Sequence, residues 1–177
     1  MEIRRLRSAD ADVFREIRLR ALAEAPYAFG SSLAQETANG PEFWQGRVDE
    51  SATARKGAIF AAIGEDRRAL AMAGGFFPQL GDEEAVLWGM WVSPHARRGG
   101  LGRRLLAEVV DWARSCGARR LRLCVSETDR SRAAAALYVA LGFSEVGERE
   151  PLPSDPTITT VTMVKDLASG DSPGSAG

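Results

Sequence analysis

The stretch from Val92 to Gly102 has residue types that could bind an anion. It reads Val-Ser-Pro-His-Ala-Arg-Arg-Gly-Gly-Leu-Gly and lies between an apolar run of strand length and an amphipathic helical pattern. Glycines remove the side chains that would keep a ligand away from the backbone. Exposed amides at the start of the following helix, at the positive end of its dipole, favour phosphate without needing a lysine. Four arginines add positive charge around this segment: Arg97, Arg98, Arg103 and Arg104.

A glycine-rich loop alone is weak evidence for a phosphate site. The same residues would also make a flexible turn before a helix, with arginines that are merely solvated. The segment lacks the Gly-Lys-Ser/Thr ending of a nucleotide P-loop and the glycine spacing of a dinucleotide-binding turn. The expected phosphates are therefore not those of ATP or NAD.

Two motifs in the chain resemble the signatures of one protein family. Arg97, Gly100 and Gly102 match the pattern Arg/Gln-x-x-Gly-x-Gly/Ala, which is similar to the pyrophosphate-binding signature of the GNAT superfamily of N-acetyltransferases. The stretch Ala134–Phe143 resembles the family segment Ala-x-x-Leu-Tyr-x-x-x-Gly-Phe. The resemblance implies a mixed α/β (α+β) fold, with a splayed mixed sheet, an antiparallel N-terminal meander and flanking helices. It also implies acetyl transfer from acetyl-CoA to an amine.

The resemblance further assigns an acetyl-CoA site. The acetyl-pantetheine arm would lie between the strand that ends at Val92 and the strand Leu121–Val125. Trp91 and Val92 would offer backbone groups to this arm, and the Val92 amide would polarise the thioester carbonyl. The arginines and glycines of the loop would hold the pyrophosphate. The expected acetyl-CoA-binding residues are Trp91, Val92, Arg97, Arg98, Gly99, Gly100, Leu101, Gly102, Arg103, Ser131 and Tyr138.

Tyr138 is the expected general acid. It matches the family tyrosine that donates a proton to the departing CoA thiolate, and its alternative is a helix-face aromatic that packs in the core. Family members usually transfer the acetyl group directly, so the resemblance implies no cysteine nucleophile. Cys116 and Cys124 fit a helical stripe and a strand, where thiols behave as small apolar groups.

The general base is not matched by a family residue. Some family members carry a glutamate on the strand before the glycine-rich loop, at the position that here holds Val86. Glu84 lies two residues earlier, on the same strand face, and is the candidate that could act through a water molecule. Asp82 and Glu83 are its neighbours, and all three also fit a polar turn that leads into the strand. Ser131 stands where the family often has asparagine, and it can still cap a helix.

Apolar periodicity predicts the elements that position these residues. The expected strands are 3–7, 58–64, 69–77, 85–92, 121–125, 143–149 and 157–164. The expected helices are one capped by Ser8, then 41–49, 101–116 and 131–141. Residues 26–40 are expected to form a loop. One domain is expected over residues 1–167, followed by a disordered tail of small and polar residues at 168–177.

Composition limits the function classes. The chain has 177 residues, and its 23 basic and 24 acidic side chains nearly cancel, so a nucleic-acid partner is not expected. No apolar run approaches the length of about 18 residues that a membrane span needs. His95 is the only histidine and the two cysteines lack metal-site spacing, which argues against a metal site and a His-dependent triad. A reducing cytoplasm is the expected compartment. The family resemblance also implies that two copies can pair as a homodimer through an exposed strand edge, and the sequence leaves the stoichiometry open.

The acceptor amine is not identified by the sequence. Loops flanking the acetyl site are expected to select it, namely residues 27–32, Phe43, Trp44 and residues 76–81, although such aromatics also fit a core. A small-molecule amine, a peptide N-terminus and a lysine all suit the chemistry. A non-catalytic acyl-CoA-binding domain, which keeps the cofactor loop and lacks the base because of Val86, is the alternative function.

Overall fold

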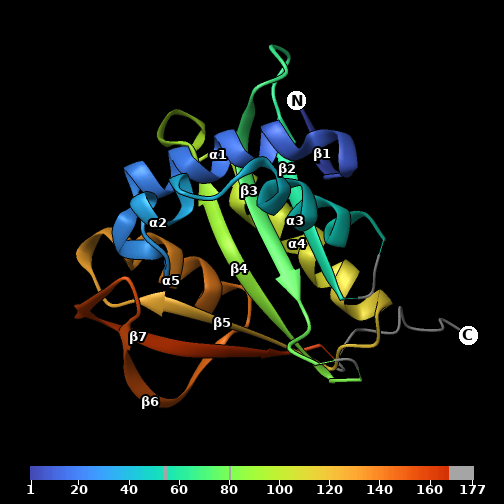
Figure 1. The fold of residues 1–177 in the computed structure, drawn as a ribbon. Helices are drawn as coiled ribbons and strands as arrows, with labels where there is room; N and C mark the ends of the chain where they lie inside the picture. The colour runs from blue at the N-terminus through green and yellow to red at the C-terminus, as the bar shows by residue number, and fades with distance from the viewer. Residues whose placement is uncertain (54–55, 80, 168–177) are drawn as a thin grey trace, which may run out of the picture.

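The central element is a seven-stranded mixed sheet with the order β1-β2-β3-β4-β5-β7-β6 (Figure 1). The structure is a computed structural model and describes residues 1–53, 56–79 and 81–167. Neighbouring strands are antiparallel except β4 and β5, which are parallel. The strands are β1 (Glu2–Arg5), β2 (Gly57–Ile63), β3 (Ala69–Phe76), β4 (Glu84–Val92), β5 (Arg120–Ser126), β6 (Ser144–Leu152) and β7 (Asp155–Asp166). The predicted mixed sheet with an antiparallel N-terminal meander is confirmed.

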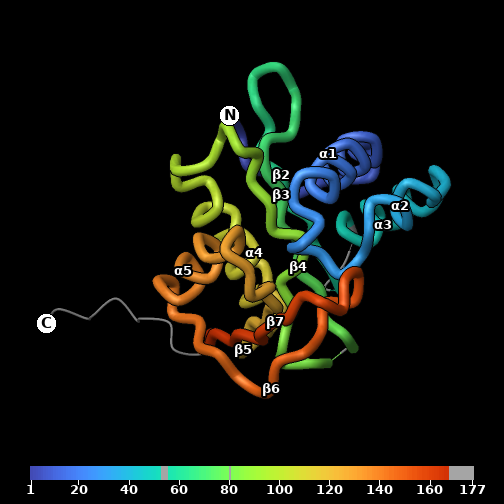
Figure 2. The backbone as a smooth tube through the Cα atoms, turned by 90° about the vertical axis from the view of Figure 1, so that its left-hand side faces the viewer, coloured from blue at the N-terminus to red at the C-terminus, as the bar shows by residue number. Residues whose placement is uncertain are grey.

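Helices cover both faces of the central strands. Helices α1 and α3, with the short α2, lie on one side, and α4 and α5 lie on the other (Figure 2). The helices are α1 (Ala11–Glu24), α2 (Leu33–Thr37), α3 (Pro41–Thr53), α4 (Leu101–Ser115) and α5 (Arg132–Ala140). Because both of its faces are covered, β2 reads as a continuous apolar run instead of an alternating one. Among the described residues, no helix has the length and apolar content needed to cross a membrane.

Helix α4 fixes the glycine-rich loop to the core. Leu105, Val109 and Trp112 recur on one face of this helix and are 0%, 0% and 6% exposed. The Trp112 ring packs against Gly75 of β3, where an added Cβ would lie 2.5 Å from the ring. On the opposite face, the Trp88 ring packs against Gly74 in the same way, at 2.4 Å from an added Cβ. One tryptophan ring therefore packs on each face of the sheet, against two adjacent glycines of β3.

Strand β4 separates from its parallel neighbour after a short contact. Only Glu84–Val86 pair with β5, opposite Arg120–Arg122. Beyond them, Gly89 has a φ of 65°, and the register between β3 and β4 shifts by one residue. Such a β-bulge bends the strand and increases its twist. The C-terminal half of β4 therefore diverges from β5.

Some predicted boundaries are corrected. Residues 26–40 are not a continuous loop, because they contain a 3-10 turn at Pro26–Ala28 and helix α2. Ser32 and Gln35 form a capping box at the start of α2, which is a recognisable sequence signal. Ser8 does not cap α1, because it lies in a 3-10 turn and α1 begins at Ala11. Helix α3 runs to Thr53. The predicted tail at 168–177 lies outside the described residues.

Candidate active site

A cavity of about 590 Å³ occupies the gap between β4 and β5. On one face of the sheet it is lined by the start of α4 and by α5, including Leu101 and Tyr138. On the other face it is lined by Tyr27, which follows α1, and by Trp88. The divergence of β4 from β5 thus produces a cavity that reaches both faces of the sheet.

The glycine-rich loop presents free backbone amides beside this cavity. Gly100 occupies the N-cap of α4 with a φ of 75°, and no side chain caps the helix. The first turn of α4 contains no acidic residue. The amides of this first turn have no intrahelical acceptor, and no side chain caps them. The helix dipole makes their surroundings positive. Arg98 also has a left-handed backbone, with a φ of 68°, which curves the loop in the manner of anion-binding concavities.

Gly102 keeps this end of the cavity open. A Cβ at Gly102 would lie 3.3 Å from Cε of Met90 and 3.4 Å from Cδ2 of Leu137. A longer side chain would therefore fill the space between α4, β4 and α5. Most of the predicted loop residues line the cavity, namely Arg97, Arg98, Gly100, Leu101, Gly102 and Arg103. Gly99 lies in the loop without lining the cavity.

The side chain of Arg97 is engaged within the protein. Its Nε donates a hydrogen bond to the Val92 carbonyl at 2.9 Å, and its Nη2 donates to Glu24 Oε2 at 2.7 Å. The same Glu24 oxygen accepts a hydrogen bond from Nε1 of Trp91 at 2.9 Å. Arg97 therefore connects the loop to the end of α1. The groups that remain free to contact an anion are the backbone amides of the loop and the other arginines. Sequence reasoning missed Glu24, because no local pattern links it to residues more than sixty positions away.

Val92 offers a free backbone amide in the gap. Ser93 donates its amide hydrogen to the Leu70 carbonyl on the β3 side at 2.8 Å. Hydrogen-bonded and non-hydrogen-bonded pairs alternate along an antiparallel ladder, so the Val92 N–H and C=O point away from β3, toward β5. By the same alternation the backbone groups of Trp91 point to β3, where Trp91 pairs with Met72. The expectation that the Trp91 backbone also serves the arm is therefore corrected.

Tyr138 lies at the cavity on α5 and is 5% exposed. Its ring packs edge-to-face against Phe143, with the ring centroids 5.7 Å apart. The hydroxyl makes no hydrogen bond with any of the described residues. Burial raises the pKa of this hydroxyl, because removal from water disfavours the phenolate. Tyr138 is therefore a protonated donor with a free O–H at the cavity wall.

Ser131 contributes a hydroxyl to the wall and does not cap α5. Its Oγ lies 2.6 Å from Oγ of Ser126 and 2.9 Å from Oγ1 of Thr128, and no capping bond is present. The predicted capping role is therefore wrong, because the hydroxyl is hydrogen-bonded to its two neighbours.

Cys124 lines the cavity as an exposed thiol, whereas the sequence predicted a purely structural role for it. Cys116 is a partly buried free thiol.

The carboxylates proposed as the base lie away from the cavity. Glu84 is in the paired half of β4, where its oxygens contact Nε of Arg122 at 2.9 Å and Nε of Arg120 at 3.4 Å. The carboxylate of Asp82 accepts the Gln79 amide at 2.8 Å, and that of Glu83 is exposed. The prediction for Glu84 is corrected, because the sheet opens only after Val86.

The described part of the cavity wall contains no carboxylate or imidazole side chain. Among the described residues, its lining includes no Asp, Glu or His side chain. In the same part of the chain, no group of three or more His, Cys, Asp or Glu is placed to hold a metal ion. The ionisable groups at the wall are four arginines, two tyrosines and one thiol. The cavity is therefore a positive environment.

The acceptor face is built from some of the predicted residues. Tyr27 lines the cavity, and the guanidinium of Arg130 lies over its ring at 5.5 Å. Trp44 lines neither of the two described cavities, because its side chain on α3 is packed in the core and is 2% exposed. Phe43 is partly exposed on α3, and Phe76 lines a second, smaller cavity.

Comparisons with known proteins agree with this architecture. Residues 18–143 match the family model described as Acetyltransferase (GNAT) family. An acetyltransferase of the GNAT family from Streptococcus pneumoniae superposes with a TM-score of 0.79 at 23% identity, covering 93% of this chain and 98% of that chain. The Salmonella typhimurium protein yncA, solved with its cofactor acetyl-CoA, superposes with a TM-score of 0.71 at 19% identity, covering 99% of both chains.

A third structure has a named acceptor. The ribosomal-protein-S18-alanine N-acetyltransferase from Escherichia coli gives a TM-score of 0.67 at 22% identity, covering 99% of both chains. No match was found among curated protein sequences.

Proposed function

The chain belongs to the GNAT acetyltransferase family, and we propose that it moves an acetyl group from acetyl-CoA directly to an amine. The observation that carries this proposal is the cavity between β4 and β5, which reaches both faces of the sheet. A thioester would enter from the α4 side, and an amine would enter from the Tyr27 side. The divergence of the two strands would let the reacting atoms meet within the sheet.

The loop before α4 would hold the pyrophosphate of acetyl-CoA. The unpartnered amides of the first helical turn and the nearby Arg98 and Arg103 suit a doubly charged anion. Gly102 suits close approach of the ligand, because its missing Cβ leaves the space beside Met90 open. The yncA structure, which contains acetyl-CoA on the same fold, supports this assignment.

Val92 and Tyr138 would divide the chemistry at the thioester. Acetyl-CoA supplies an activated acetyl group whose carbonyl oxygen gains negative charge when an amine attacks. The Val92 amide points into the gap and would donate a hydrogen bond to that oxygen. The Tyr138 hydroxyl, which has no partner among the described residues, would donate to the sulfur as the C–S bond breaks.

The acceptor amine would lose its proton to water. No Asp, Glu or His among the described residues lines the cavity, so no carboxylate or imidazole of its wall would remove the proton. Arg97 is paired with Glu24, and Arg98 and Arg103 would hold the pyrophosphate. Arg130, which lies over the Tyr27 ring on the acceptor side, would disfavour a second positive charge and lower the pKa of a bound amine. The neutral amine would therefore be the form that reacts.

The same lack of a base keeps a second function open. A domain that binds acyl-CoA without transferring its acyl group would also use the loop amides and Gly102. Catalysis is favoured because the Tyr138 hydroxyl and the Val92 amide both face the cavity, where one can donate to the sulfur and the other to the carbonyl oxygen of the thioester. Both functions suit a reducing cytoplasm, because both cysteines are free thiols.

Release of the CoA thiol from acetyl-CoA tests this proposal. The acceptors would be small amines, amino acids and peptides with free N-termini, and a reaction without acceptor would serve as the control. Amine-dependent thiol release is the expected result. A rise in melting temperature with acetyl-CoA, without thiol release for any amine, would favour the non-catalytic function.

A further inference from the structure

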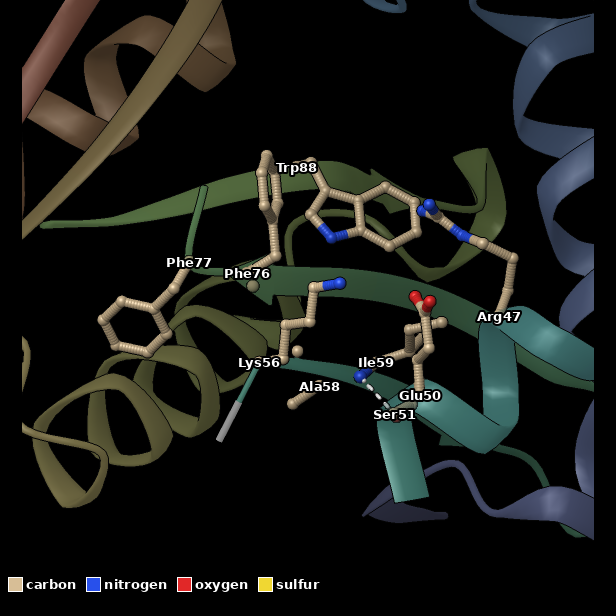
Figure 3. Close-up of a pocket in the computed structure, with 11 residues that line it drawn as sticks. Arg47, Glu50, Ser51, Lys56, Ala58, Ile59, Phe76, Phe77 and Trp88 are labelled. Carbon is tan, nitrogen blue, oxygen red and sulfur yellow. Dashed lines mark hydrogen bonds between the residues drawn. The ribbon is translucent and has the colours of Figure 1, made fainter. Parts of the chain in front are cut away.

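A second cavity, of about 140 Å³, lies where α3 meets the ends of β2 and β3. Arg47 and Glu50 of α3, Lys56 before β2, and Trp88 of β4 contribute to its wall. Figure 3 shows the charged ends of Arg47, Glu50 and Lys56 directed toward the space beside the Trp88 ring. Trp88 also lines the larger cavity. The two cavities therefore share one wall residue.

Arg47 has unused hydrogen-bonding capacity at this cavity. Its guanidinium lies over the Trp88 ring at 4.5 Å and forms no hydrogen bond or ion pair with any described residue. Burial lowers its pKa, yet arginine stays charged at neutral pH. A half-buried cation with free donors is a costly arrangement that an anion would relieve.

The neighbouring charges leave this cavity net positive. Arg18, which lies over the Trp88 ring at 5.7 Å, forms an ion pair with Glu36, with Nη2 at 2.6 Å from Oε1. These two charges therefore balance each other. The Nη1 atom of Arg18 is buried without a partner. At the cavity itself, Glu50 balances only one of the two cations Arg47 and Lys56. The residual charge favours an anionic ligand.

We propose that this cavity binds a carboxylate carried by the acceptor, so that the preferred substrate is an elongated amine with an anionic far end. The inference rests on the proposed acetyl transfer at Val92. Val92 lies four positions after Trp88 in β4, which is a backbone separation of roughly 13 Å along an extended strand and roughly 10 Å once the bulge at Gly89 is included. This separation sets the scale of the distance from the thioester to the second cavity. An α-amino acid is too short to span this distance. A straight-chain ω-amino acid would span it, with its methylene groups on the Trp88 ring.

A matched pair of acceptors tests this inference. The probes are 8-aminooctanoate, whose extended chain is about 10 Å long, and its neutral isostere 8-aminooctanamide. For the wild type, the KM for 8-aminooctanoate should be about tenfold to a hundredfold lower than the KM for 8-aminooctanamide. This is the difference expected from one charge-assisted hydrogen bond. Arg47→Gln should remove this preference without changing the KM for acetyl-CoA. Arg15→Gln, an exposed arginine of α1, is the matched control and should change neither value.

A second variant separates the inference from a folding defect. Among the described residues, Glu50 is the only carboxylate of the cavity wall. Glu50→Gln should therefore lower the KM for 8-aminooctanoate, a gain that partial unfolding does not produce. Equal KM values for the two probes in the wild type would overturn the inference while leaving acetyl transfer intact.

If no amine is acetylated, the proposed function fails. Calorimetric titration with 8-aminooctanoate then tests separately whether the second cavity binds the carboxylate. Binding that is lost in Arg47→Gln would support the site. The absence of binding to the wild type would overturn it.

Discussion

Replacing Tyr138 by phenylalanine removes one hydroxyl and keeps the ring. The ring packs against Phe143 and is 5% exposed, and these contacts are retained in Tyr138→Phe. The hydroxyl has no hydrogen-bond partner among the described residues, so its loss leaves no such group unsatisfied. The free energy of unfolding should therefore change by less than about 0.5 kcal/mol.

The expected effect on catalysis is much larger. A positioned general acid contributes roughly 10²- to 10⁴-fold to a rate. The lower end applies here, because a thiolate whose conjugate acid has a pKa of about 8.5 leaves readily. We expect kcat to fall about 100-fold, while the Kd for acetyl-CoA stays within about threefold, as for an interaction made only in the transition state. Burial raises the pKa of Tyr138, so the wild type should lose no activity through ionisation of this residue below about pH 10.

The chain offers a matched control, because Tyr27 is its only other tyrosine and lines the acceptor side of the same cavity. Tyr27→Phe should leave kcat within a few-fold of the wild type. Initial rates of thiol release and calorimetric titration with acetyl-CoA measure the two quantities. A kcat for Tyr138→Phe within about threefold of the wild type would refute the role of the hydroxyl.

Three further predictions concern the cavity, the proton and the core. Gly102→Glu should abolish acetyl-CoA binding in titration, because its side chain would fill the space beside Met90, whereas Gly46→Glu, at an open position on α3, should bind normally. Because the neutral amine reacts, kcat/KM should rise with pH up to the pKa of the amine itself, and Glu84→Gln should leave this profile unchanged; an ascending limb that disappears in Glu84→Gln would restore Glu84 as the base. Gly75→Ala should lower the free energy of unfolding by about 1–3 kcal/mol, since its Cβ would lie 2.5 Å from the Trp112 ring; a denaturant curve matching the wild type would contradict the packing described for β3.

Local patterns were sufficient to predict the framework of the site. Glycines before an amphipathic helix indicated exposed amides, and the structure places Gly100 at the N-cap of α4 with a left-handed backbone. The second motif placed Tyr138 on a helix, and the structure brings it to the same cavity. Both features depend on backbone geometry within a few residues, which the sequence encodes directly.

Features that depend on long-range geometry were not predictable in this way. Glu84 was predicted to share a strand face with Val86 or to lie in the turn before it, and it is the first residue of β4. The position at which β4 leaves β5 depends on the bulge at Gly89 and on pairing with distant residues. The link from Glu24 to Arg97 joins residues 73 positions apart, and no periodic pattern signals it. The packing of the Trp88 ring against Gly74 likewise depends on the register between β3 and β4.

The most direct test of the central claim is mass spectrometry of an amine incubated with the protein and acetyl-CoA that carries an isotope-labelled acetyl group. We predict that the label appears on the amine with the wild type and is absent with Gly102→Glu, because the cavity between β4 and β5 holds the donor. An unlabelled amine with the wild type, or equal labelling by both proteins, would contradict the account.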